Sequence, residues 1–411
     1  MDQREIQDSP RLEKQVRSII DHVRKRGDTA LIHYTKVFDG TRISADKLQV
    51  KPEEIKNAYR EVPREFLKTL KRAARRIRRF HRLIRQRSIT ESEKGIQLGQ
   101  VIRPFERVGV YVPGGKASYP STVLMAAIPA HVAGVRKIIM TTPPHQGGIS
   151  PAVLVAADLA GVDQIYRIGG AQAIAALAYG TRTIPKVDKI VGPGNRYVAT
   201  AKRMVFGVVD VDMVAGPSEI LILSDGRTPP SFVAADMISQ AEHDEMALAI
   251  LITPSEAFGK RVKEEIERQL STLKRWKIAK ASLERRGAIL IVRDMPKAIE
   301  LANRIAPEHL EVCLANPFPF LQKIRNAGAV FLGRHTPEAI GDYLAGPNHI
   351  LPTAGTARFS SSLGVEDFMK RINWMRFTKE ALRHFEKDVK RFTEWEGLEG
   401  HFKAVQIRLD A

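Results

Sequence analysis

The chain has 411 residues, of which 44% are hydrophobic and 27% are charged, as in ordinary globular proteins with a large core. Its single cysteine, Cys313, excludes an internal disulfide framework and a cysteine-rich zinc site. The formal net charge of +19 at pH 7 is high enough to suit a nucleic-acid partner, so the position of the basic residues matters.

The start of the chain, MDQREIQDSPRLEKQ, is polar and does not resemble a signal peptide. No stretch approaches the roughly 20 apolar residues that a membrane-spanning helix needs. The most apolar one, VLMAAIPAHVAGV, is interrupted by Pro129 and His131. We therefore expect a cytoplasmic protein with no membrane partner.

The N-terminal region, residues 1–106, is predicted to be mainly helical and to pack with the second of two α/β domains. Apolar residues from Val16 to Val23 are spaced for one helix face, and Asp28 is placed to cap the next helix, TALIHYTKVF. The segment from Arg64 to Arg87 holds eleven Lys/Arg against one acidic residue.

This basic segment is predicted to be an amphipathic helix that buries one apolar face. The residues at helical spacing are Phe66, Leu70, Ala73, Ala74, Ile77, Phe80 and Ile84. A solvated basic face explains the charge better than a phosphate-binding surface, because no zinc-finger, RNP-type or helix-turn-helix pattern accompanies it. We therefore do not expect a nucleic-acid partner.

Short apolar runs alternate with helical stretches over residues 107–218, which predicts a parallel sheet covered on both faces. The strand-like runs are VGVYV, KIIMTT, QIYRI and KIV. Residues 219–363 repeat the pattern with EILILSD, ALAILIT, AILIVR, LEVCLAN and AVFLG. The fold class is thus α/β with two Rossmann-like domains. The tail, residues 364–411, is predicted to be helical and basic, without strand partners.

Glycine-rich turns follow three strands of the first α/β domain: Pro113-Gly114-Gly115, Gly169-Gly170 and Gly192-Pro193-Gly194. Glycines at such turns let backbone N–H groups approach an anion, and ligands of open α/β sheets bind beyond the carboxyl ends of strands. The G-x-G-x-x-G dinucleotide fingerprint is absent, because GPGNRY ends in Tyr197, so nucleotide binding and plain tight turns both remain open. The side chains best placed to touch a bound ligand are Tyr111, Gln172 and Asn195.

The stretch DMISQAEHD places Gln240 and His243 three residues apart, on one face of a helix. An amide and an imidazole there could belong to a metal or substrate pocket, or to a capped helix end with a solvated histidine. Downstream, Glu308 and His309 lie at the head of a strand and are a workable pair for proton removal near neutral pH. Solvated polar residues after a helix-ending proline are the alternative. Cys313, within an apolar strand, is predicted to be buried and inert.

Asp342 lies in a glycine-punctuated loop and is a plausible oxygen ligand. With Gln240, His243 and His401 it makes a nitrogen and oxygen ligand set without sulfur. Such a set suits zinc with room left for substrate atoms, so the metal would be catalytic or substrate-holding rather than structural.

Seven stretches in order along the chain resemble the histidinol dehydrogenase family, and the similarity extends from about residue 26 to the C-terminus. They are YVPGGKASYPSTVLM, IVGPGNRYVATAK, DMVAGPSEI, ADMISQAEHD, APEHLEV, GDYLAGPNHILPT and EGLEGHFKAV. The resemblance implies an aldehyde-dehydrogenase-like arrangement of the two domains. It also implies NAD-dependent, zinc-dependent oxidation of L-histidinol through L-histidinaldehyde to L-histidine, the last step of histidine biosynthesis.

The resemblance further implies roles for individual residues. The zinc ligands would be Gln240, His243, Asp342 and His401, which would also contact the substrate, and Glu308 and His309 would be the proton-transfer pair. Ser218, His309 and Glu396 would contact substrate, and Tyr111, Gln172 and Asn195 would contact NAD. Family members are homodimers in which the C-terminal tail reaches the partner's active site, so Glu396 and His401 would serve the opposite subunit.

Two alternatives stand beside this interpretation. A paralogue of the same fold could oxidise another alcohol, such as a sulfonated diol. Its pocket would favour a basic residue where this chain has Glu396, which suits a cationic amine instead. A basic nucleic-acid-binding protein built on a degenerate enzyme fold would show tight binding with a steep salt dependence.

Overall fold

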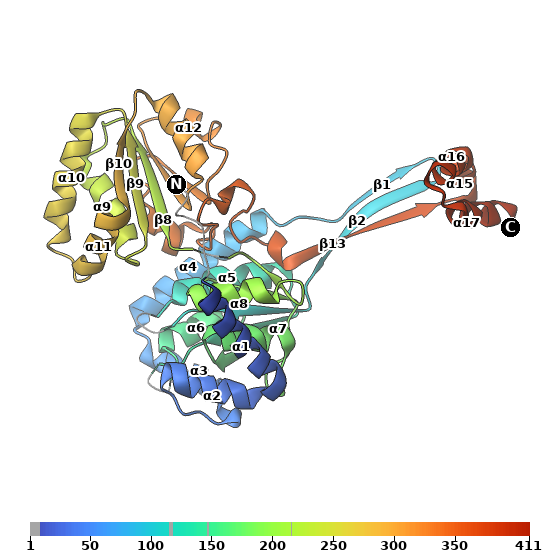
Figure 1. Ribbon diagram of the computed structural model, residues 1–411, viewed down its shortest axis with the longest axis horizontal. Coiled ribbons are helices and arrows are strands. Elements are labelled where there is room, and N and C mark those ends of the chain that lie inside the picture. The colour runs from blue at the N-terminus through green and yellow to red at the C-terminus, as the bar shows by residue number, and fades with distance from the viewer. Residues whose placement is uncertain (1–8, 115–117, 146–147, 215) are drawn as a thin grey trace. The chain divides into compact units, whose positions relative to one another are not determined.

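The computed structural model describes residues 9–114, 118–145, 148–214 and 216–411. The chain forms two compact units (Figure 1). Unit 1 comprises residues 1–84 and 105–368, and unit 2 comprises residues 85–104 and 369–411. Within the described residues, every helix is too short or too polar to cross a membrane.

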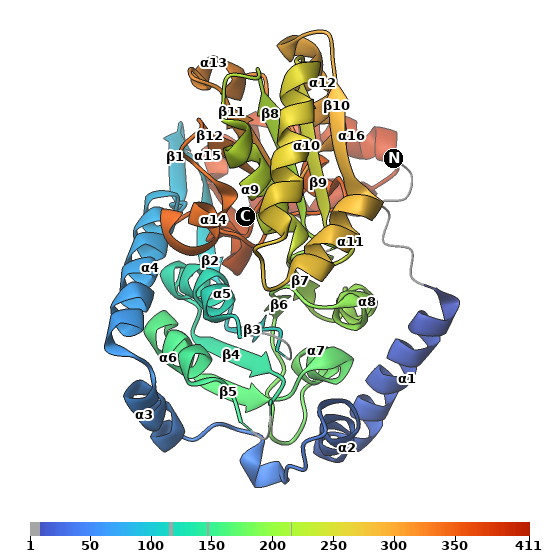
Figure 2. The ribbon, with the colours of Figure 1, turned by 90° about the vertical axis from the view of Figure 1, so that its left-hand side faces the viewer.

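The first sheet of unit 1 is parallel, with the strand order β5-β4-β3-β6-β7. Its strands are β3 (Arg107–Tyr111), β4 (Lys137–Thr142), β5 (Gln164–Arg167), β6 (Lys189–Val191) and β7 (Asp210–Val211). The connecting helices are α5 (Pro120–Ala133), α6 (Pro151–Ala160), α7 (Gly170–Tyr179) and α8 (Arg196–Val205). Helices α5 and α6 cover one face and α7 and α8 the other (Figure 2). The predicted alternation is confirmed, and the short strand β7 is an addition to it.

The second sheet of unit 1 is also parallel, with the order β10-β9-β8-β11-β12. Its strands are β8 (Glu219–Ser224), β9 (Leu248–Thr253), β10 (Gly287–Ile291), β11 (His309–Cys313) and β12 (Ala329–Leu332). Its helices are α9 (Pro230–Ala241), α10 (Glu256–Leu270), α11 (Trp276–Arg286), α12 (Met295–Ile305) and α13 (Phe318–Leu321). Because both faces are covered, the central strands β8 and β11 are buried along their whole length and read as continuous apolar runs.

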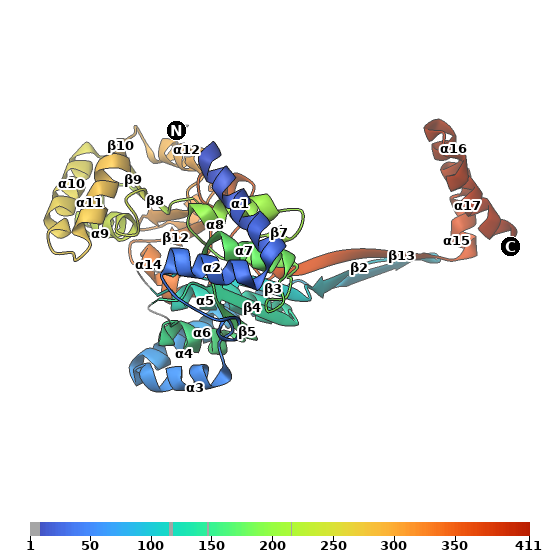
Figure 3. The same cartoon turned by 60° about the horizontal axis from the view of Figure 1, so that its bottom comes forward.

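The N-terminal helices pack differently from the prediction, which placed them with the second α/β domain. They are α1 (Pro10–Arg26), α2 (Asp28–Asp39), α3 (Pro52–Glu61) and α4 (Arg64–Leu83). Helices α1 and α2 lie against α7, α1 also contacts α8 (Figure 3), and α3 contacts α6. The cause is the apolar face of α1, from Leu12 to Val23, which joins the core of the first sheet. Helix α4 contacts α5 of the first sheet and also a short helical segment near residue 341.

Unit 2 contains strands that the sequence analysis missed. An antiparallel sheet of order β1-β2-β13 is built from β1 (Ile89–Glu93), β2 (Ile96–Pro104) and β13 (Met369–Phe377). Its residues are exposed or half-buried throughout, so the segments lack the continuous apolar runs by which the buried strands of unit 1 are detected. From Lys379 onward the tail is helical, as predicted, with α15 (Lys379–His384), α16 (Glu386–Glu396) and α17 (Glu399–Asp410).

Candidate functional site

The carboxyl edge of the first sheet has its topological switch point between β3 and β6, the place where open α/β sheets bind ligands. Tyr111 ends β3, and the turn after β6 leads to Asn195, the N-cap of α8. Gly192 in that turn has φ of 113°, and a Cβ there would lie 2.1 Å from the Tyr111 carbonyl oxygen. The buried Lys202–Asp212 ion pair holds the turn, because Asp212 accepts from Gly192 N at 2.7 Å and Lys202 donates to Gly192 O at 3.0 Å.

The same edge carries polar atoms without protein partners. Tyr111 is buried, and its hydroxyl accepts a hydrogen bond from Gly170 N, at the start of α7, at 3.1 Å. Gln172 is 1% exposed, yet neither amide atom has a hydrogen-bond partner in the described part of the chain. An amide orphaned beside a helix N-terminus fits a dinucleotide, which offers both donors and acceptors. Gly115, in the predicted turn after β3, lies outside the described residues.

The predicted pair Glu308 and His309 is buried at the amino end of β11, 7% and 4% exposed, which excludes the solvated alternative. Ala306 ends α12 with φ of 51°, an uncommon conformation for a residue with a Cβ, and turns the chain into the strand. One residue of β8 then binds both side chains. Glu219 donates its N–H to Glu308 Oε2 at 2.8 Å and offers its carbonyl to His309 Nδ1 at 2.9 Å.

This geometry fixes the tautomer of His309. The Glu219 carbonyl can only accept, so Nδ1 of His309 carries the hydrogen and Nε2 is the free, basic nitrogen. Nε2 has no hydrogen-bond partner among the residues that the structure describes. Burial lowers the pKa of His309 and so favours the neutral imidazole. The negative charge of Glu338 opposes this shift but is the smaller effect. Burial also raises the pKa of Glu308 well above its usual value.

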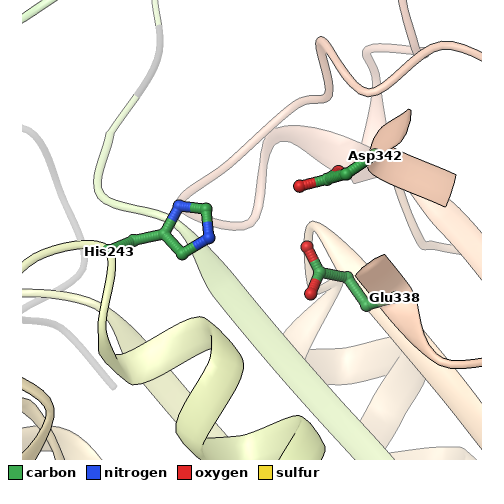
Figure 4. Close-up of side chains that lie close together, drawn as sticks. All are labelled: His243, Glu338 and Asp342. Carbon is green, nitrogen blue, oxygen red and sulfur yellow. The ribbon is translucent and has the colours of Figure 1, made fainter. Parts of the chain in front are cut away.

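Three side chains that could together hold a metal ion lie close to one another (Figure 4). His243, Glu338 and Asp342 each offer one ligand atom, and these atoms all lie within 4.8 Å of one another. His243 follows α9, Glu338 starts α14 (Glu338–Ile340), and Asp342 lies in η3 (Gly341–Ala345), a single π-helical turn. Such turns often occur at functional sites. Nε2 of His309 lies 3.8 Å from Glu338 Oε1.

The charges of the cluster favour a bound cation. Burial raises the pKa of Asp342 to about 8, and Glu338 beside it adds to the rise. Gln240, the third predicted ligand of unit 1, is fully buried at the end of α9, and both its amide atoms lack a hydrogen-bond partner within the described ranges. Buried amides are normally paired. Imidazole, carboxylate and amide oxygen together form the donor set that suits zinc, so the residues fit this metal.

A cavity of about 640 Å³ opens beside the cluster. His243, Glu242 and Asp342 line its polar side, and Phe66 and Leu70 of α4 line its apolar side. The N-terminus of α5, which follows β3 across the carboxyl edge of the first sheet, lines the same cavity. The cavity therefore adjoins the cluster and the start of α5, whereas Tyr111, Gln172 and Asn195 are not among its lining residues.

The remaining predicted residues lie on other elements of the chain. Ser218 is half-buried directly before β8, next to Glu219, whose backbone binds Glu308 and His309. Glu396 and His401 belong to unit 2, where they end α16 and lie in the first turn of α17, both exposed. Cys313 ends β11, at the opposite end of the strand from His309. It is buried, and burial raises the pKa of its thiol, as expected of an inert cysteine.

Sequence reasoning missed Glu338 and Glu219. Glu338 precedes Asp342 by four residues, a spacing that brings side chains together on a helical turn, but the segment shows no apolar periodicity that predicts a helix. Glu311 fixes its position by accepting a hydrogen bond from Glu338 N at 2.7 Å. Glu219 contacts Glu308 and His309 through its backbone N–H and carbonyl. Every residue except proline has these groups, so the residue type at this position does not predict the contacts.

Comparison with known proteins gives a consistent result. The sequence model of the family described as histidinol dehydrogenase matches residues 2–409. The chain is 55% identical over 401 residues to histidinol dehydrogenase of Syntrophotalea carbinolica, which covers 97% of this chain and 93% of that protein. It is 53% identical over 400 residues to that of Bacillus cereus, with the same coverage.

A solved structure shows the same fold. The crystal structure of histidinol dehydrogenase from Elizabethkingia anophelis superposes with a TM-score of 0.95 at 38% sequence identity. The alignment covers 99% of this chain and 94% of that one. The similarity thus includes both sheets of unit 1 as well as the strands and helices of unit 2.

Proposed function

The chain belongs to the histidinol dehydrogenase family, and from this we propose that it oxidises L-histidinol through L-histidinaldehyde to L-histidine. The reaction is the last step of histidine biosynthesis, removes four electrons in two stages, and uses NAD and zinc. An enzyme that draws on the cellular NAD supply for amino-acid biosynthesis belongs in the cytoplasm.

Gln240, His243, Asp342 and His401 would hold the zinc ion. The orphaned amide of Gln240 and the close approach of His243 to Asp342 support this assignment. Bound there, zinc would supply a Lewis-acidic anchor for the imidazole and amine of the substrate. His349 keeps Asp342 in place, because its Nδ1 donates to the Asp342 carbonyl at 3.0 Å. Ser218 and Glu396 would complete the contacts to the substrate.

Tyr111, Gln172 and Asn195 would hold NAD along the carboxyl edge of the first sheet. The free amide of Gln172 and the glycine turn next to Asn195 support this placement. Bound NAD supplies the hydride acceptor, and the protein supplies orientation.

His309 and Glu308 would move the protons. His309 Nε2, kept basic by the Glu219 carbonyl at Nδ1, accepts the proton of the substrate hydroxyl as the carbinol carbon loses hydride. In the second stage Glu308 deprotonates the water that hydrates the aldehyde, and its raised pKa makes the ionised form a stronger base. His309, after releasing its first proton to solvent, then accepts a proton from the hydrate as the second hydride passes to a second NAD. No thiol is needed, in agreement with the buried Cys313.

We also propose a homodimer in which each tail completes the partner's site with Glu396 and His401. Large apolar side chains exposed on the same tail support this, among them Phe392 at 70% and Trp395 at 93%. In this arrangement residues 107–218 form the NAD-binding domain and residues 219–363 carry the metal and acid–base residues. The tail, residues 364–411, is exchanged.

The observation that carries the proposal is the free Nε2 of His309, fixed by Glu219 beside the His243–Asp342 cluster. The test is steady-state NADH formation from L-histidinol, with metal analysis before and after chelation. We expect turnover that disappears with the metal and returns with zinc. A sulfonated diol serves as the control substrate. Turnover of the diol without any turnover of L-histidinol at millimolar concentration would overturn the proposal.

A further inference from the structure

Asp39, at the end of α2, lies close to the proposed cofactor edge of the first sheet. Thr183 Oγ1, beyond the C-terminus of α7, donates to Asp28 Oδ2 at 2.6 Å. This bond replaces the capping role predicted for Asp28. It ties the start of α2 to the end of α7, and the two helices pack together with similar lengths. Helix α2 therefore runs back from the C-terminal end of α7 towards its N-terminal end, which is the end nearest the cofactor edge.

The electrostatics of Tyr111 agree with this placement. Burial raises the pKa of Tyr111 to about 12, the hydrogen bond from Gly170 opposes the rise, and the charge of Asp39 adds to it. Interactions between charges weaken with distance, so Asp39 lies near the phenol that marks the end of β3.

Three side chains at this edge, two of them buried and Asp39 half-buried, have buried polar atoms for which the described residues provide no hydrogen-bond partner. They are Asp39 through Oδ2, Thr141 through Oγ1 and Gln172 through both amide atoms. They come from α2, β4 and α7, and Thr141 lies opposite Tyr111 in the β3–β4 ladder. Buried polar atoms are normally paired, so a group of unpaired ones from three elements indicates a polar ligand.

The carboxylate of Asp39 is suited to accept hydrogen bonds from the hydroxyl groups of a ligand. Burial raises its pKa to about 6, and the described residues provide it with no ion pair, so at pH 7 it is mostly an unpaired carboxylate. An ionised carboxylate only accepts hydrogen bonds. The two neighbouring hydroxyls of a ribose can donate two hydrogen bonds to this carboxylate. A phosphate on the same ring is negatively charged and would be repelled by it.

We infer that Asp39 binds the adenosine ribose of the dinucleotide through its hydroxyls and thereby selects NAD over NADP. The inference rests on the proposed function, and it assigns the adenosine half for a geometric reason. Asp39 belongs to the helix layer outside the first sheet, whereas the nicotinamide must meet His309 on the second sheet.

The test is a thermodynamic cycle between protein and ligand, measured by isothermal titration calorimetry without substrate. The proteins are wild type and Asp39→Asn, and the ligands are NAD and 2′-deoxy-NAD. We expect removal of the hydroxyl to weaken binding about tenfold in the wild type and less than twofold in Asp39→Asn, because the two changes delete one interaction. NADP should bind wild type at least about tenfold more weakly than NAD, and Asp39→Asn should narrow this gap.

Asp46→Asn is the matched control, because Asp46 is an exposed carboxylate of the next connection and should leave every affinity unchanged. An unchanged NAD-to-NADP ratio in Asp39→Asn would overturn the inference, and NADH formation from L-histidinol would then show that the proposed function stands. Wild-type protein that binds neither dinucleotide would overturn both. If Asp39→Asn fails to fold, the wild-type comparison still decides, since equal affinity for NAD and 2′-deoxy-NAD would refute a contact with the hydroxyl.

Discussion

At the scale of single residues, the proposed catalytic pair, Glu308 and His309, depends on one backbone position. Glu219 uses its N–H for Glu308 and its carbonyl for His309, so replacing the Glu219 side chain leaves both hydrogen bonds in place. The backbone of β8 thus determines which imidazole nitrogen of His309 is basic. Substitution of the Glu219 side chain should therefore leave this tautomer unchanged.

Replacement of His309 and of His243 should have different effects. His309→Asn should lower kcat by about 100-fold or more, the usual contribution of a general base, and leave bound zinc unchanged. His243→Asn should lose zinc together with activity. Metal analysis by mass spectrometry and steady-state kinetics on both variants provide the measurement. Equal loss of zinc in the two variants would show that the roles are misassigned.

His81 makes stability depend on pH. It is 1% exposed within α4, and neither ring nitrogen has a hydrogen-bond partner among the described residues. Burial lowers its pKa to about 4, below the value of roughly 6.5 in an unfolded chain. The unfolded state therefore binds the proton more tightly. The stability is fully present above about pH 6.5 and falls towards pH 4 by up to roughly 3 kcal/mol.

Denaturant unfolding of wild type and His81→Leu at pH 6.5 and pH 4.5 tests this dependence. The loss at low pH should shrink in His81→Leu. His33→Gln, at an exposed histidine of α2, should keep the wild-type dependence. Identical pH dependence in all three proteins would mean that other groups are responsible.

At the scale of elements, the turn between β6 and α8 requires a glycine at position 192 for two reasons, its positive φ and its close approach to the Tyr111 carbonyl. The two effects can be measured separately. Gly192 and Gly207 both have positive φ, 113° and 95°, but a Cβ meets the Tyr111 carbonyl only at Gly192 and nothing within 4 Å at Gly207. Gly207→Ala should thus cost only backbone strain, about 1 kcal/mol or somewhat more.

Gly192→Ala should destabilise the protein further and weaken NAD binding by at least about tenfold, because the turn beside Asn195 must shift. Thermal unfolding and calorimetric titration with NAD on both variants provide the measurement. If Gly207→Ala weakened NAD binding as much as Gly192→Ala, the close approach would not be the cause.

The elements that could be predicted are those that bury apolar side chains. Every strand of the two parallel sheets except β7 stood out, because a strand covered on both faces is a continuous apolar run. The strands of unit 2 did not stand out in the sequence, because they bury few apolar side chains. For the site, Gln240, His243 and Asp342 could be found from residue type and family resemblance. Glu338 and the backbone of Glu219 could not, because their roles depend on a π-helical turn and a strand register that no local pattern records.

At the scale of the whole molecule, the proposed exchange of tails can be tested by complementation. A His401→Asn variant and a His309→Asn variant should each be nearly inactive. After mixing, partial unfolding and reassembly, hybrid dimers would contain one site with both histidines intact, so activity should return to about a quarter of that of wild type if hybrids form at random. A control mixture of His309→Asn with Glu308→Gln should stay inactive, because both lesions then lie in unit 1. No recovery in the first mixture would refute the exchange.

Trp395 gives this assembly an optical signal. Its indole is 93% exposed on a tail that carries other apolar side chains in contact with water, whereas Trp276 is 42% exposed on α11. In a background with Trp276 and Trp374 replaced by Phe, fluorescence should shift to longer wavelength on dilution, as subunits separate and water reaches the ring. The midpoint of that shift would report the dissociation constant of the dimer, and the melting temperature should fall over the same range of concentration.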